Sequence, residues 1–165
     1  MDYRTVLNEI YSVGKVMEGL GNVATYIPEL SNVDPDKFGI YLLTLDRQGY
    51  GIGDDKERFS IQSISKIFTV SMAIRILGES VWKRVGVEPS GSSLNSMVQL
   101  EYEKGYPRNP LINPGALVIA DMLISNLANP KEDLLDFVRM VSGYESITFD
   151  EKVAESEKRT GFRNA

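Results

Sequence analysis

The chain contains neither cysteine nor histidine among its 165 residues, and these two absences exclude several kinds of chemistry. Without cysteine there can be no disulfide, no thiolate nucleophile and no thiolate-bound metal. Without histidine the chain cannot supply a Ser-His-Asp triad or a histidine-ligated zinc centre. If the protein carries out covalent catalysis, its general base must therefore be a lysine, a tyrosine or a carboxylate.

The chain also lacks an excess of positive charge and a long apolar segment. Its formal net charge is -5 and its pI is near 4.9, which argues against a nucleic-acid partner. The longest apolar stretch, "ALVIADMLI", contains Asp121 and falls far short of the ~18 residues that a membrane span needs. Because the N-terminus begins polar rather than as a secretory signal, we expect a cytoplasmic protein with no membrane segment.

The order of the predicted elements indicates the α+β class. Apolar residues at helical spacing predict a helix over residues 3–19, and two strand-like segments around the turn at residues 46–49 predict a β-hairpin. About five helices follow in the prediction, beginning with a buried helix from Ser60 that Gly78 ends.

Three later boundaries are also predicted from turn and capping residues. Pro114 occupies a first helical turn, and that helix is expected to run to Asn129. Gly143 is expected to end the next helix, and a capping box of Thr148 and Glu151 is expected to open the last one.

We expect residues 1–165 to form a single incomplete domain. Residues 1–60 supply a helix and the hairpin, and residues 61–165 supply the helical portion. A two-stranded hairpin is only marginally stable without further strands or another partner. We therefore expect this chain to be the N-terminal part of a longer protein.

A serine three residues before a lysine, the S-x-x-K pattern of Ser/Lys acyl-transfer enzymes, is a candidate for histidine-free catalysis. The pattern occurs at Ser12/Lys15, Ser63/Lys66 and Ser80/Lys83. Only Ser63 and Lys66 lie at the start of a strongly apolar helix. There an apolar environment would lower the lysine pKa, and helix N-terminal amides would stabilise an oxyanion. The alternative is a capped helix whose lysine extends to solvent.

Five blocks of the sequence resemble the glutaminase family, the serine-dependent enzymes that hydrolyse glutamine to glutamate and ammonia. They lie in the family's order between residues 23 and 164: "VATYIPEL", "FSIQSISKIF", "VEPSGSSLNSMVQLE", "GYPRNPLINPGALVIADML" and "ESEKRTGFRN". The resemblance implies a β-lactamase/transpeptidase-like α+β fold. It covers nearly the whole chain but only about the first half of the family's domain.

Position by position, the resemblance implies three catalytic residues. Ser63 matches the nucleophile, Lys66 its general base, and Tyr26 an active-site tyrosine that contacts the substrate and shares in proton transfer. The implied substrate-binding residues are Gln62, Ser63, Asn113, Glu157 and Asn164. The resemblance implies L-glutamine as the substrate, a glutamyl ester on Ser63 as the intermediate, and neither a metal nor an organic cofactor.

The chemistry of these residues suits an amino-acid substrate. The carboxylate of Glu157 could pair with the α-ammonium of glutamine, and the amides of Gln62, Asn113 and Asn164 could hold its carboxylate and side-chain amide. From the residues alone, each also has an ordinary structural interpretation. Tyr26 could be a packing aromatic, Asn113 a helix cap, Glu157 part of a solvated helix face, and Asn164 could have no role.

The chain departs from the family pattern in two ways. Pro114 stands where the family commonly has a small residue, although a proline in a first helical turn should leave Asn113 in place. The family's later residues, which contribute further tyrosines, a backbone oxyanion contact and the remaining strands, are absent from these 165 residues.

Three functions remain open at this point. The resemblance implies a glutaminase that assembles as a homo-oligomer, a dimer or a tetramer. The same fold also hosts β-lactam-binding and transpeptidase-like serine enzymes, although no K-T-G motif is present. The third alternative is a truncated, non-catalytic assembly fragment, whose exposed sheet edge and incomplete core would drive association.

Overall fold

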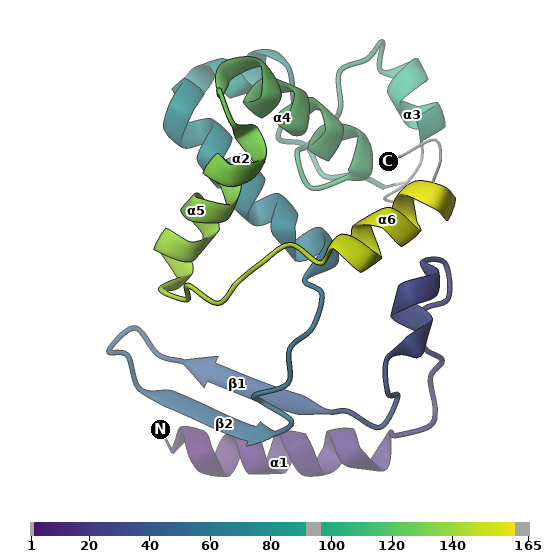
Figure 1. The fold of residues 1–165 in the computed structure, drawn as a ribbon, viewed down its shortest axis with the longest axis vertical. Helices are drawn as coiled ribbons and strands as arrows, with labels where there is room; N and C mark the ends of the chain where they lie inside the picture. The colour runs from purple at the N-terminus through teal and green to yellow at the C-terminus, as the bar shows by residue number, and fades with distance from the viewer. Residues whose placement is uncertain (1, 92–96, 161–165) are drawn as a thin grey trace. The chain divides into compact units, whose positions relative to one another are not determined.

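The computed structural model describes residues 2–91 and 97–160, which fall into two compact units (Figure 1). The first unit combines the described parts of residues 1–60 and 150–165, and the second comprises the described parts of residues 61–149. One boundary between the units follows Ser60. The grouping of the last helix with the N-terminal residues is not indicated by the order of elements along the chain.

The first unit contains a hairpin with one helix against it and a second helix packed on a short 3-10 turn. Its elements are α1 (Tyr3–Val16), η1 (Pro28–Asn32), β1 (Gly39–Leu43), β2 (Gly49–Gly53) and α6 (Glu151–Thr160). The two strands pair antiparallel, with Ile40 opposite Ile52. The predicted hairpin is therefore confirmed, with a loop in which Arg47 adopts a positive φ of 64°.

Helix α1 packs against both strands of the hairpin. It begins after Asp2, whose carboxylate accepts hydrogen bonds from the N–H groups of Arg4 and Thr5. Leu7 is buried, and the ring of Tyr11 stacks on Phe38 with centroids 5.2 Å apart. The predicted helix is confirmed, although it ends at Val16 instead of residue 19.

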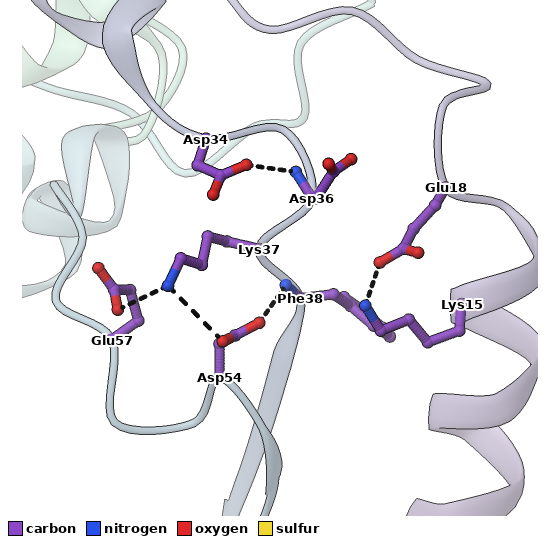
Figure 2. A network of polar contacts seen from close by, with 8 residues as sticks. All are labelled: Lys15, Glu18, Asp34, Asp36, Lys37, Phe38, Asp54 and Glu57. Carbon is purple, nitrogen blue, oxygen red and sulfur yellow. Dashed lines mark hydrogen bonds and ion pairs between the residues drawn. The ribbon is translucent and has the colours of Figure 1, made fainter.

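A network of polar contacts joins the two ends of the hairpin (Figure 2). The Asp54 carboxylate accepts a hydrogen bond of 2.9 Å from the N–H of Phe38, at the start of the hairpin. The ammonium of Lys37 lies 3.3 Å from Glu57 and 3.8 Å from Asp54. Because these charges are partly exposed, the ion pairs add little stability, and the backbone hydrogen bond of Phe38 fixes the geometry.

Helix α6 packs against η1, although the two lie more than a hundred residues apart in the chain. The hydroxyl of Ser156, which is 2% exposed, accepts a hydrogen bond of 3.3 Å from the N–H of Glu29. Helix α6 is opened by Asp150, whose side chain accepts from the N–H of Val153. The prediction that Thr148 caps this helix is therefore wrong, because Asp150 is adjacent to the first helical residue.

The second unit is helical in all its described elements. These are η2 (Gln62–Ile64), α2 (Ser65–Leu77), η3 (Gly78–Lys83), α3 (Met97–Tyr102), α4 (Asn113–Asn126) and α5 (Pro130–Ser142). Helix α2 packs against α4, α5 and η3. The core between them consists of Met72, Ala73, Val81, Val85, Ile119, Met122 and Leu123.

Most of the predicted helix boundaries of this unit are confirmed. Helix α2 ends at Gly78 with φ of 56°, and α5 ends at Gly143 with φ of 73°, a conformation that glycine adopts without strain. Helix α4 has Pro114 in its first turn, as predicted, but ends at Asn126 because Leu127 is extended. Among the described residues, no helix is both long enough and apolar enough to span a membrane.

The core of the second unit should respond to the loss of buried volume. Ile119 of α4 is fully buried, so Ile119→Ala leaves a cavity and should lower the free energy of unfolding by about 2–5 kcal/mol. The matched control is Ile124→Ala on the same helix, where the side chain is 64% exposed and the change should stay within about 0.5 kcal/mol. Urea denaturation followed by circular dichroism measures both, and equal losses would contradict this packing.

Candidate active site

Ser63 lies in η2, a single 3-10 turn that runs directly into α2. The helix was expected to begin at Ser60, whereas α2 itself begins at Ser65. Ile64 and Ser65 both have right-handed helical backbone angles, so the chain from Ser63 to Lys66 forms one helical turn. Residues three apart in such a turn lie on the same side, which supports the predicted pairing. The Ser63 side chain is exposed.

Lys66 is half-buried, and its amine donates a hydrogen bond of 2.6 Å to the Oδ1 atom of Asn113. Burial lowers the pKa of Lys66 below its ordinary value, because an ammonium loses solvation there. Among residues 2–91 and 97–160, Lys66 forms no ion pair, and no hydrogen bond joins its amine to the Ser63 hydroxyl. The amine is therefore held beside α4 by a neutral partner.

Asn113 is the first residue of α4, and its position depends on the loop that precedes it. The side-chain oxygen of Asn109 accepts hydrogen bonds from the N–H groups of Leu111 and Ile112. Gly115 lies so close to this loop that a Cβ atom there would be 1.9 Å from the Asn109 carbonyl oxygen. The Asn113 side chain forms no helix cap, contrary to the structural alternative, and contacts Lys66.

Gln62 precedes the candidate nucleophile in a conformation that is unfavourable for its residue type. Its φ is 44°, in the left-handed region, which costs about 1–2 kcal/mol for a residue with a Cβ atom. The strained residue forms the bend from which the turn carrying Ser63 starts. This left-handed conformation could not be predicted, because neither glycine nor asparagine occupies the position.

The other two candidate residues that the structure describes lie in the first unit. Tyr26 is 69% exposed and comes directly before Ile27, which is 1% exposed and anchors the start of η1. Glu157 is exposed on α6, next to Ser156, whose hydroxyl holds the backbone of η1. Tyr26 and Glu157 therefore extend from two segments that pack together.

The described residues thus bring the candidates together in two groups. Gln62, Ser63, Lys66 and Asn113 belong to the second unit, and Tyr26 and Glu157 to the first. Asn164, the remaining predicted substrate-binding residue, lies outside the described residues. No three acidic side chains gather within residues 2–91 and 97–160 so as to hold a metal ion.

The two other S-x-x-K pairs form local contacts of a structural kind. The hydroxyl of Ser12 donates to the carbonyl of Asn8, and Lys15 pairs with Glu18. The hydroxyl of Ser80 donates to the carbonyl of Leu77. Their contacts agree with the structural interpretation, and the pair at the start of α2 remains the candidate for chemistry.

Sequence reasoning missed Asn109 and Ser156, which fix the segments that carry Asn113 and Tyr26. A signal for Asn109 was present, because an asparagine before a proline is typical of a turn whose side chain binds nearby backbone amides. Ser156 had no such signal, since its partner Glu29 lies 127 residues away in the chain.

Solved structures share this fold. A probable glutaminase matches it with a TM-score of 0.91 at 29% identity, over 99% of this chain and 54% of the other. A probable glutaminase from Bacillus subtilis, solved with 6-diazo-5-oxo-L-norleucine, matches with a TM-score of 0.78 at 30% identity, over 99% and 50%. The α+β class is confirmed, and the matching region is part of the β-lactamase-like fold of the glutaminases.

Comparison of the sequence with protein families and curated relatives identifies one family within this fold class. The family model described as Glutaminase matches residues 21–165. A glutaminase of Saccharophagus degradans is 54% identical over 164 residues, which cover 99% of this chain and 53% of that protein. The chain belongs to the glutaminase family, and it spans about half the length of the curated relatives it matches.

The strain at Gln62 can be tested by comparing glycine with alanine at this position. Gln62→Gly should be more stable than Gln62→Ala by roughly 0.5–1 kcal/mol, because only glycine relieves the left-handed strain, although its chain entropy offsets part of the gain. At Ser71, in the middle of α2, the order should be reversed, with alanine favoured by about 1 kcal/mol. Thermal or urea unfolding measures both pairs, and the same order at both positions would show that Gln62 is unstrained.

Proposed function

We propose that the protein hydrolyses L-glutamine to L-glutamate and ammonia through a glutamyl ester on Ser63. The observation that carries this proposal is the half-buried Lys66, which lies in the first turn of α2, three residues after Ser63, and has a lowered pKa and a neutral partner. Such a lysine can lose its proton and act as a general base. The chain has no histidine, so a lysine base is one of the few ways in which it could activate a serine.

The proposed reaction proceeds in two steps. The proton of Ser63 Oγ moves to the neutral Lys66 amine while Oγ forms a bond with the side-chain amide carbon of glutamine. The amide C–N bond then breaks, the proton passes to the leaving nitrogen, and ammonia departs. Water hydrolyses the glutamyl ester and restores the serine. The backbone N–H of Ser63 would stabilise the oxyanion of the tetrahedral intermediate.

The substrate-binding part of the proposal assigns the remaining candidates. Glu157 would pair with the α-ammonium of glutamine, and Gln62, Asn113 and Asn164 would bind its polar groups without added charge. Tyr26 would contact the substrate and share in proton transfer. Support for an amino-acid ligand comes from the Bacillus subtilis relative, whose ligand is an α-amino acid with a reactive group at the end of its side chain.

Ammonia release tests the proposed nucleophile. Ser63→Ala should lower kcat with L-glutamine by at least about 10⁴-fold, because the change removes the hydroxyl that forms the proposed glutamyl ester. Ser80→Ala is the matched control from another S-x-x-K pair, and it should leave the rate unchanged. A Ser63→Ala variant as active as the wild type would refute the mechanism.

The assembly state and the location are part of the same proposal. We propose a homo-oligomer, a dimer or tetramer, in the cytoplasm, with the two compact units as parts of one domain. Support for assembly comes from an exposed apolar stripe on α1 and the residues directly after it. This stripe consists of Val6, Ile10, Val13, Met17 and Leu20. The absence of cysteine agrees with a reducing compartment without requiring one.

Sedimentation velocity tests whether this stripe joins two copies. Val13→Lys should shift the protein towards the monomer, because an ammonium would be buried at an apolar interface. Val33→Lys, an exposed valine outside α1, should leave the sedimentation coefficient unchanged. A wild-type protein that is monomeric at every concentration would contradict the proposed oligomer. Cell fractionation tests the proposed cytoplasmic location. A single unfolding transition in calorimetry is the result expected if the two units form one domain.

A further inference from the structure

We propose that Asn113 is a positioning residue for Lys66, in addition to any contact it makes with substrate. Its side-chain oxygen holds the lysine amine in place through a hydrogen bond of 2.6 Å and contributes no charge. This inference rests on the proposed function, because it concerns the base of that reaction.

The contact joins the first turns of two helices that pack against each other. Lys66 is the second residue of α2 and Asn113 the first residue of α4. The helices are fixed relative to each other by the core around Ala73 and Ile119, both fully buried. The hydrogen bond is therefore made between two points that the core already holds at the required distance.

The backbone that carries Asn113 is constrained on both sides. Pro114 fixes its own φ and has no N–H to be satisfied, so the helix can begin here without using the Asn113 side chain as a cap. Before it, Ile112 is buried and its N–H is bound by Asn109. The Asn113 amide is thereby left available for the amine of Lys66.

An amide oxygen suits this position because it binds the Lys66 amine without stabilising its charged form as a carboxylate would. A carboxylate at the same distance would favour the ammonium and raise the pKa of Lys66. With a neutral acceptor in its place, burial lowers this pKa. Asp121 of α4 pairs with Arg84, and Asp136 of α5 lies near Arg139. The other charged side chains on α2 and on the elements packed against it are Arg75, Glu79, Lys83, Lys131, Glu132 and Asp133, and none of them forms an ion pair with Lys66.

Anchoring the amine also gives its lone pair a direction. A neutral lysine amine carries two N–H bonds and one lone pair, and it rotates freely when it has no partner. With one N–H directed at Asn113, fewer orientations remain, and one of them can direct the lone pair to the Ser63 side. Among the described residues, the Nδ2 group of Asn113 has no acceptor, so it stays available to a substrate oxygen.

Two variants of Asn113 separate charge from position. Asn113→Asp keeps an acceptor of the same shape but adds a negative charge, and Asn113→Leu keeps the volume but removes the acceptor. Asn126→Asp is the matched control, since it makes the same chemical change at the other end of α4, about 20 Å away along the helix. At that distance the added charge is largely screened from Lys66.

The first readout is nuclear magnetic resonance of the ¹³Cε group of Lys66, assigned by comparison with Lys66→Arg. Asn113→Asp should raise the pKa of Lys66 above the wild-type value, and Asn126→Asp should leave it unchanged. Asn113→Leu should make the ε-methylene group of Lys66 as mobile as those of exposed lysines. An unchanged pKa in Asn113→Asp, or an equally ordered methylene group in Asn113→Leu, would overturn the inference.

The second readout is the pH dependence of ammonia release. Because the neutral amine is the active form, kcat/KM should rise with pH as Lys66 loses its proton. In Asn113→Asp this rise should occur at higher pH, so that activity is partly rescued in alkali, whereas Asn113→Leu should lose about 10- to 100-fold in kcat at every pH. If Asn113 had only a structural role, both variants would lose activity, and the pH at which kcat/KM rises would stay the same. If the wild type releases no ammonia, the proposed function fails, and the resonance measurements still decide the role of Asn113.

Discussion

The site depends on a lysine amine that is partly removed from water and is bound by a neutral amide instead of a carboxylate. Burial disfavours the ammonium, and the Asn113 oxygen holds the amine without restoring a counter-charge. The packing of α2 on α4 makes this possible, because it brings Lys66 to a residue 47 positions later in the chain. The Ser63 turn then begins at the strained Gln62 and runs into the same helix.

Local signals predicted those parts of the fold that depend on neighbouring residues. The glycines at positions 78 and 143 end helices as expected, and Pro114 lies in a first turn. The predicted cap at Thr148 was wrong, because Asp150 directly precedes the helix and its side chain binds the N–H of Val153. The apolar period of α1 identified the helix, but the side chains that produced this period are exposed.

Only part of the candidate site could be predicted, because local patterns identify residues that are close together in the chain. Ser63 and Lys66 are near neighbours, so a pattern and a helical period could identify them. The bond from Lys66 to Asn113 and the bond from Ser156 to Glu29 join distant segments, and no local pattern encodes such pairings. The family resemblance named Asn113 and Glu157, and the structure adds what holds their surroundings in place.

The central claim is that an uncharged Lys66 makes Ser63 reactive toward the side-chain amide of glutamine. Rapid acid quenching of the protein during turnover, followed by peptide mass spectrometry, tests it most directly. The account predicts one glutamyl group on the peptide that contains Ser63, formed faster as the pH rises and absent in Lys66→Arg. Turnover of glutamine without any acylated serine, or with the glutamyl group on another residue, would contradict it.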